Sequence, residues 1–280
     1  MKNRWLSVAI YLICSLVGIF ALLYPFFLPA GERSAQTIQP RSAEMPLMLT
    51  VLMSLALLVL IYEVQSQAAN TRLIALLGVL VAINAALRFM DSAAPVPGGF
   101  SPIFFLILLT GYVYGARFGF LMGVMTLVVS AILTGGVGPW LPAQMFTAGW
   151  VGMSAAILRP ALRALRLNGQ PGEIGFLAGL GAIWGILFGA IMNLWTWPFI
   201  AGPADQYWVY GVGLGETIRR YASFYLATSL IWDIARAAGN FLLILILGAP
   251  ALRALRRFKN RFTFTYLPAP VADDQKECSG

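Results

Sequence analysis

The chain of 280 residues contains no histidine and only two cysteines. The lack of histidine removes the commonest general base and the commonest metal ligand, which argues against hydrolases that work inside the membrane. Cys14 lies in an apolar segment and Cys278 in a polar tail, so neither a disulfide framework nor a metal-ligand spacing is present. We therefore predict no metal site, no resident cofactor and no enzymatic activity.

Charge is also scarce, since only 11% of the residues are charged and 59% are hydrophobic. Soluble domains carry about 25% charged residues, and the mean hydropathy here is +0.78. This composition predicts an integral membrane protein. The net charge of +8 indicates membrane topology rather than nucleic-acid binding, because most basic residues stand in short connections beside apolar segments.

Eight apolar segments predict transmembrane helices, because a helix satisfies its own backbone hydrogen bonds in lipid. They lie at about 5–28, 46–65, 73–90, 101–115, 118–134, 143–158, 175–197 and 224–247. The fourth segment is short, which leaves seven spans as an alternative. The first resembles a signal peptide but is too long for a typical cleaved one, so we expect a retained anchor.

The basic residues predict the orientation. With the N-terminus in the cytoplasm, five of the 19 basic residues fall outside (Arg33, Arg41, Arg88, Arg219 and Arg220), Arg236 falls within the last span, and the other 13 are cytoplasmic. This bias predicts a multi-pass protein of the cell membrane with both termini in the cytoplasm. The tail 262–280 is polar and is expected to be disordered.

Two outer connections, 135–142 and 198–222, are rich in glycine, proline and aromatic residues. Such loops can close over a ligand, but Trp and Tyr also favour ordinary interfacial loops. A heptapeptide, PALRALR, occurs at 160–166 and again at 250–256. Each copy follows a predicted span at its cytoplasmic end, and we expect its proline at the first helical position. The copies could form amphipathic turns at the lipid surface, but we favour ordinary positive-inside anchoring.

The last predicted span contains the polar motif WDIARAAGN at 232–240. Asp233, Arg236 and Asn240 have the spacing i, i+3, i+7 and so share one helix face. An Asp or Arg at a span centre costs about 2.5–3.5 kcal/mol to insert. The pair is therefore either a structural salt bridge or a ligand contact that faces a cavity open to the outside, and the sequence leaves both readings open.

Further polar and aromatic side chains stand near the outer helix ends. Arg88 and Asp91 could simply reach water at the interface. The complete set of predicted substrate-binding residues is Asn84, Arg88, Asp91, Trp140, Gln144, Asn193, Trp197, Trp232, Asp233, Arg236 and Asn240.

Small residues recur at four-residue spacing, as in helices that pack closely in lipid. The ladders are Gly78–Ala82–Ala86, Gly111–Gly115, Gly119–Gly123 and Gly181–Gly185–Gly189. We interpret most of them as packing within the bundle. The first could instead be an external docking face.

The region from about 73 to 261 resembles the substrate-binding S component of energy-coupling factor (ECF) vitamin transporters. The resemblance depends on the Gly78–Ala82–Ala86 ladder, on GYVYGARFGFLMG (111–123), on LTGGVGPWLPAQMFTAGWVGMSAAILRP (133–160) and on WDIARAAGN. It implies a six-helix substrate-binding core at 71–261, preceded by two extra helices in 1–70 and followed by the tail 262–280. The GGVGPWLP block is most similar to the subgroups associated with cobalamin or related corrinoids.

The resemblance also implies roles and partners. Ala82 and Ala86, with Gly78, correspond to the face that docks on a transmembrane scaffold subunit. Asp233 and Arg236 correspond to vitamin-contacting positions. No glycine precedes a lysine, so the chain has no Walker A loop, and the resemblance implies that two separate ATPase subunits supply the energy.

Two other classes remain open on the residues alone. A secondary transporter could use Asp233 and Arg236 as an intramembrane ion or proton relay, although inverted repeats would then be expected. A purely structural membrane protein would need the pair only for packing.

Overall fold

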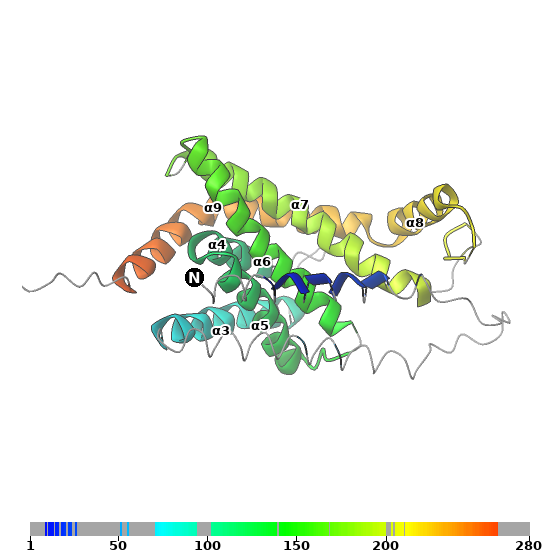
Figure 1. The fold of residues 1–280 in the computed structure, drawn as a ribbon, viewed down its shortest axis with the longest axis horizontal. Helices are drawn as coiled ribbons and strands as arrows, with labels where there is room; N and C mark the ends of the chain where they lie inside the picture. Colours follow the sequence, from blue (N-terminus) through cyan, green and yellow to red (C-terminus); the bar gives the residue numbers. More distant parts are fainter. Residues whose placement is uncertain are drawn as a thin grey trace, which may run out of the picture.

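The computed structural model describes residues 71–93, 102–138, 140–167, 169–199, 203, 205–209 and 211–262, with isolated positions between 9 and 26 and at 51 and 55. Those ranges hold seven α-helices and one 3₁₀-helix, and no strand (Figure 1). They are α3 (Thr71–Ala93), α4 (Ile103–Tyr114), α5 (Ala116–Thr134), α6 (Leu141–Ala164), α7 (Pro171–Thr196), η1 (Trp197–Phe199), α8 (Leu214–Thr228) and α9 (Leu230–Phe262). The predicted span 46–65, most of 5–28 and the tail after 262 lie outside the described residues.

Five of these helices are long and apolar enough to cross a membrane. The spans are Arg72–Phe89, Ala116–Thr134, Leu141–Ala164, Pro171–Phe199 and Leu230–Arg261. The prediction of an all-helical, multi-pass membrane protein is therefore confirmed. The number of eight spans is not, because the described part supplies five.

The predicted span 101–115 is the short helix α4, which does not cross the membrane by itself. Its 12 residues rise about 18 Å, against a hydrocarbon core of about 30 Å. Ten of the 12 are buried, because α3, α5, α6, α7 and α9 all pack around this helix. A helix that is apolar on every side belongs in such a core. Gly115, with φ at 104°, ends α4 and lets α5 begin at the next residue.

The predicted loop 198–222 and span 224–247 have different boundaries in the structure. An amphipathic helix, α8, occupies Leu214–Thr228, the chain breaks at Ser229, and α9 then runs as one helix to Phe262. The reason is periodicity: Tyr221 and Phe224 turn towards the bundle at helical spacing, while Glu216 and Arg219 lie on another face of α8. Only Phe224 of α8 is buried, which explains why the segment reads as a loop in a hydropathy scan.

The two PALRALR copies do not start helices, so that expectation is wrong. Pro160 lies inside α6 and Pro250 inside α9, as membrane helices allow when neighbouring groups satisfy the freed carbonyls. The first copy instead ends α6. Arg166 adopts a left-handed φ of 56°, and the Leu167 amide donates to the Leu162 carbonyl at 2.9 Å, which forms a Schellman cap.

Glycines bring α4, α5 and α6 into backbone contact, which confirms their interpretation as packing residues. A Cβ placed on Gly111 would lie 1.9 Å from the Gly152 carbonyl oxygen, and one on Gly123 would lie 2.2 Å from that of Ala148. A Cβ on Gly152 would lie 2.1 Å from the Gly119 carbonyl oxygen. Backbone atoms cannot yield as a flexible side chain can, so these positions accept glycine alone.

Replacing Gly152 with alanine is expected to destabilise the bundle by at least about 1–3 kcal/mol, the usual cost of overpacking. Gly175→Ala on α7 is the matched control, because a Cβ there meets nothing within 4 Å and alanine favours the helix. Thermal unfolding in detergent measures both variants. Equal melting temperatures for the two would contradict the close contact between α5 and α6.

The ladder on α3 differs from the others because it faces outward. Nothing lies within 4 Å of a Cβ on Gly78, and Ala82 and Ala86 are exposed. The opposite side of α3, with Val81 and Ala85, is buried against the bundle. The ladder is thus a smooth apolar strip on the outer surface of the described bundle.

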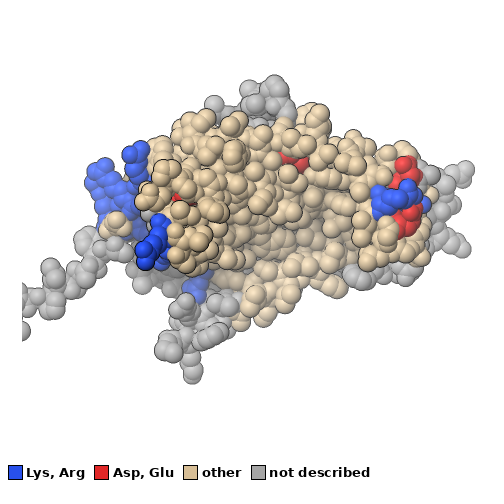
Figure 2. All heavy atoms as spheres, turned by 90° about the horizontal axis from the view of Figure 1, so that it is seen from above, with Lys and Arg blue, Asp and Glu red and all other residues tan. Residues whose placement is uncertain are grey.

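Charges separate along the molecule, and Figure 2 shows most of the Lys and Arg side chains at one end. We call this the basic end. Its cationic residues are Arg72, Arg117, Arg159, Arg163, Arg166, Arg253, Arg256, Arg257, Lys259 and Arg261. Glu173 is the one described acidic residue among them. The opposite end carries α8, where both signs of charge occur.

Candidate functional site

The site centres on a buried ion pair in the first turns of α9. Arg236 Nη1 lies 2.5 Å from Asp233 Oδ1, and the side chains are 20% and 1% exposed. Ser229 Oγ donates to Asp233 Oδ2 at 3.1 Å, and Arg236 Nη1 also reaches the Gly185 carbonyl oxygen at 3.4 Å. The predicted shared face is confirmed for these two residues, and a buried, hydrogen-bonded pair is stable in lipid where a lone charge is not.

Two glycines of α7 make room for the pair. A Cβ on Gly189 would lie 1.9 Å from Asp233 Oδ1, and one on Gly185 would lie 2.5 Å from the Ala237 Cα. The Gly181–Gly185–Gly189 ladder is therefore the contact surface for α9, as predicted. Phe188, next to the ladder, places its ring centroid 5.9 Å from the Arg236 guanidinium carbon, a cation–π contact.

Asn240 lies one turn further along α9 and is fully buried. Its Nδ2 donates to the Arg236 carbonyl oxygen at 2.9 Å, while its Oδ1 has no hydrogen-bond partner among the described residues. It does not join the ion pair. A buried amide oxygen without a partner is uncommon in proteins and leaves an acceptor below the pair.

Aromatic side chains cover the α8 end of α7, and we call Trp197, Trp208, Tyr221 and Phe224 the aromatic cap. Trp197 Nε1 donates to the Gln206 carbonyl oxygen at 2.8 Å, and the Tyr221 hydroxyl donates to the Ala190 carbonyl oxygen at 2.6 Å. Trp197, Trp208 and Phe224 are buried. The cap thereby ties η1, the segment 205–209 and α8 together next to the ion pair.

Tyr225 of α8 was not among the sequence-predicted residues. Its hydroxyl is buried without a hydrogen-bond partner among the described residues. Burial, and then the nearby carboxylate of Asp233, raise its pKa well above the ordinary value. Its signal in the sequence is weak because the break at Ser229 separates it from the motif on α9. Tyr225 and Ser229 together extend the polar group around Asp233.

The outer side of α8 carries a fork of one acid and two bases. Arg219 Nε and Arg220 Nε donate to the Glu216 carboxylate at 2.8 and 2.7 Å. The hydrogen bonds from Arg219 and then Arg220 lower the pKa of Glu216 to about 2. Arg220 also lies 5.5 Å from the centroid of the Tyr207 ring, which links the fork to the segment beside the aromatic cap.

A carboxyl whose pKa is lowered by folding stabilises the protein at any pH above its pKa in the unfolded state. That stabilisation is lost as the pH falls through its pKa in the folded state. The melting-temperature difference between the wild type and Glu216→Gln should therefore stay constant from about pH 8 to about pH 5 and vanish towards about pH 2. Calorimetric scans across that range measure it. A difference that has already disappeared at about pH 5 would contradict the lowered pKa.

The structure does not bring the other predicted residues to the pair. Asn84 is buried in the core, where Nδ2 donates to the Ile103 carbonyl oxygen and to Thr126 Oγ1 at 3.1 and 3.2 Å; it joins α3, α4 and α5. Trp232 is 51% exposed and Trp140 is 44% exposed. Asn84 thus packs within the core, and the two tryptophans lie on the outer surface of the described bundle.

The remaining predicted residues lie elsewhere. Asn193 Nδ2 donates to Thr228 Oγ1 at 3.3 Å and so connects α7 to α8 beside the aromatic cap. Gln144 and Arg88 are half-buried on α6 and α3. The side chain of Asp91 lies outside the described residues.

A second buried carboxylate, Glu173, lies near the basic end, and no pattern in the sequence predicts it. It accepts hydrogen bonds from the Tyr112 hydroxyl, from Arg256 and from the Gly169 amide, the last at 2.9 Å. Arg159 and Lys259 donate nearby to the Val113 carbonyl oxygen at 3.3 and 2.6 Å. Tyr112 and Arg256 lie 61 and 83 residues from Glu173 in the sequence. No local spacing therefore predicts these contacts.

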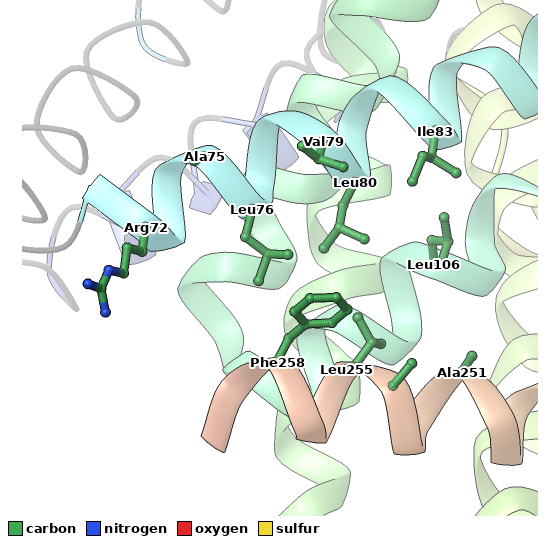
Figure 3. A pocket seen from close by; sticks show the side chains of 11 residues that line it. Arg72, Ala75, Leu76, Val79, Leu80, Ile83, Leu106, Ala251, Leu255 and Phe258 are labelled. Atoms are coloured by element: carbon green, nitrogen blue, oxygen red, sulfur yellow. The ribbon is translucent and has the colours of Figure 1, made fainter. Parts of the chain in front are cut away.

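A cavity of about 570 Å³ lies between α3 and the second half of α9, at the basic end (Figure 3). Its lining is apolar except for Arg72. It does not border Asp233, which is enclosed by α7, α8 and α9. This cavity is therefore not the open cavity that the sequence analysis expects beside Asp233 and Arg236.

A comparison with protein-family models shows the family of the chain. Residues 72–248, more than half of the chain, match the family of the substrate-specific component of ECF transporters. The chain belongs to that family. No curated protein and no solved structure matched significantly. The S component is a transporter subunit and not an enzyme, and S components pair in general with an ECF module.

Proposed function

We propose that this S component binds a vitamin at the Asp233–Arg236 pair, beneath the aromatic cap. The proposal depends on the buried pair itself, because charged side chains cost free energy to place in a membrane. Polar atoms without hydrogen-bond partners lie near the pair. Tyr225 Oη and Asn240 Oδ1 are both buried without described partners. A polar ligand would satisfy these atoms and exchange hydrogen bonds with the pair.

For the ligand we propose cobalamin or a related corrinoid. The corrin ring carries many carboxamide groups, which donate to a carboxylate and accept from a guanidinium or a phenol. Its apolar faces suit contact with large aromatic side chains. The GGVGPWLP block supports the same choice through its resemblance to cobalamin-type members.

The cap must move for such a ligand to enter, because Trp197, Trp208 and Phe224 are packed over the α8 end of α7 in the described residues. We propose that this end faces the outside. The basic end would then lie in the cytoplasm, in agreement with the positive-inside rule.

Calorimetric titration of the purified S component tests the proposal, with cyanocobalamin, cobinamide and riboflavin as ligands. We expect binding of the corrinoids with a dissociation constant well below 1 μM. Binding of riboflavin alone would overturn the corrinoid assignment but keep the vitamin site. Binding of none of these and of no other B vitamin would overturn the function.

We further propose that Gly78, Ala82 and Ala86 dock against the transmembrane scaffold subunit of an ECF module, to which two ATPase subunits attach. The strip is smooth and exposed, as close helix contact in lipid requires. Ala82→Leu with Ala86→Leu should abolish co-purification with the module while ligand binding persists. Ala249→Leu, at another exposed position on α9, should leave both unchanged. Retained co-purification of the double variant would contradict docking at this strip.

A further inference from the structure

The described positions between 9 and 26, which we call the N-terminal segment, are helical and turn one face towards the bundle. The residues of this face recur every three or four positions, which places them on one side of a helix. They are Tyr11, Ser15, Gly18, Leu22 and Phe26. Tyr11 and Leu22 are each 8% exposed, whereas Leu16, on the other side, is 64% exposed.

The first half of this face contacts α5 and α6. The Tyr11 ring meets the Phe120 ring edge-on, with their centroids 5.3 Å apart. Trp150 Nε1 donates a hydrogen bond to Ser15 Oγ at 3.2 Å. A Cβ on Gly18 would lie 3.1 Å from the nearest side-chain atom of α6. These contacts fix the segment in one register on the bundle, which a segment that only tethers a chain to lipid does not need.

The second half of the face reaches the aromatic cap. Leu22 shares a buried cluster with Trp195 of α7. The ring centroid of Phe26 lies 5.7 Å from that of Trp208, edge-on at 85°, and 6.0 Å from that of Trp197. Phe26 therefore joins η1 and the segment 205–209, the two parts of the cap that precede α8, from a distant part of the chain.

We propose that Phe26 is a positioning residue of the vitamin site, which holds the aromatic cap closed over the Asp233–Arg236 pair. This inference rests on the proposed function, because it makes the opening of the cap the step that admits and releases the ligand. The N-terminal segment is then a working part of the S component and stays attached in the mature protein.

The expected size of the effect follows from the two ring contacts. A tilted or edge-on aromatic pair favours the closed cap by a factor of about 2–12. Phe26 makes two such contacts, so its removal should raise the open fraction of the cap at least about fivefold. Because the cap opens before a ligand enters and before it leaves, the association and dissociation rate constants should rise together. The loss of a direct ligand contact would instead raise mainly the dissociation rate constant.

Stopped-flow binding of cyanocobalamin to the full chain, followed by tryptophan fluorescence, tests the proposal. Phe26→Ala should raise both rate constants at least about fivefold and leave their ratio nearly unchanged. Phe26→Tyr keeps the ring and should behave as the wild type does, and so should Leu16→Ala, the matched control on the exposed side of the same segment. Phe26→Leu loses both ring contacts but keeps much of the volume; it should raise both constants and decides the question if Phe26→Ala does not fold.

Hydroxyl-radical footprinting compares the same variants without any vitamin. It measures the oxidation rate of Phe224 on α8, which is 5% exposed in the closed cap, and we expect faster oxidation in Phe26→Ala. Unchanged oxidation, or a dissociation rate constant that rises alone, would overturn the proposal. A vitamin-binding protein whose intact mass begins after residue 26 would overturn it too. Because footprinting needs no ligand, this failure is distinguishable from failure of the proposed function, in which no B vitamin binds.

Discussion

Glu173→Ala is expected to lower the free energy of unfolding by about 2–4 kcal/mol. Breaking a buried ion pair costs about 3–5 kcal/mol because it leaves the partner uncompensated, and the Arg256 side chain, at 38% exposure, recovers part of that from water. The change also leaves the Tyr112 hydroxyl and the Gly169 amide without their acceptor. Glu173→Gln should cost less, since the amide oxygen still accepts a hydrogen bond.

Thermal unfolding in a fixed detergent measures this effect. Glu216→Ala is the matched control, because it removes the same side chain from an exposed ion pair, and exposed pairs contribute little to stability. Its melting temperature should fall much less than that of Glu173→Ala. If Glu173→Ala and Glu216→Ala were equally stable, the network that joins α4, α7 and α9 would have no part in holding the bundle together.

Asp233→Ala is expected to weaken vitamin binding by about 10-fold to 100-fold. A hydrogen bond to a charged group contributes about 1.5–3 kcal/mol, and the loss of the carboxylate also frees the Arg236 side chain from its position over Phe188. Calorimetric titration measures the affinity. Trp232→Ala, at the adjacent but 51% exposed position, should bind as the wild type does.

The double variant Asp233→Ala/Arg236→Ala separates a ligand contact from a structural salt bridge. If the pair serves packing alone, the double variant should be more stable than Asp233→Ala, because no uncompensated charge remains, and its affinity should match the wild type. We expect the stability to recover and the affinity to stay low. Wild-type affinity in the double variant would rule out a ligand role for the pair.

Local patterns in the sequence predicted what depends on one helix. Asp233 and Arg236 could be paired from their spacing because an i, i+3 pair needs no knowledge of the fold. The glycine ladders were equally predictable, since four-residue spacing is enough to place Gly181, Gly185 and Gly189 on one helix face. The structure adds only what they touch.

The missed features depend on contacts between distant segments or on a weak periodicity. Glu173 contacts Tyr112 and Arg256 only because α4, α7 and α9 pack together. Composition and local spacing therefore cannot predict this hydrogen-bond network. The helix α8 was missed because its charged face lowers the mean hydropathy that a span search measures. Trp232 stands one residue before Asp233, which turns its side chain by about 100° round the helix, so it lies 51% exposed while Asp233 is buried.

The glycine contacts of α4 and α5 have a mechanical consequence. Gly111 of α4 and Gly119 of α5 both lie against the Gly152 backbone, which fastens the two helices to α6. Those three helices should move as one rigid block during any transport step. The freedom to admit a solute then resides in α8 and the segment 205–209, which lie outside that block and are joined to α7 and η1 by side-chain hydrogen bonds.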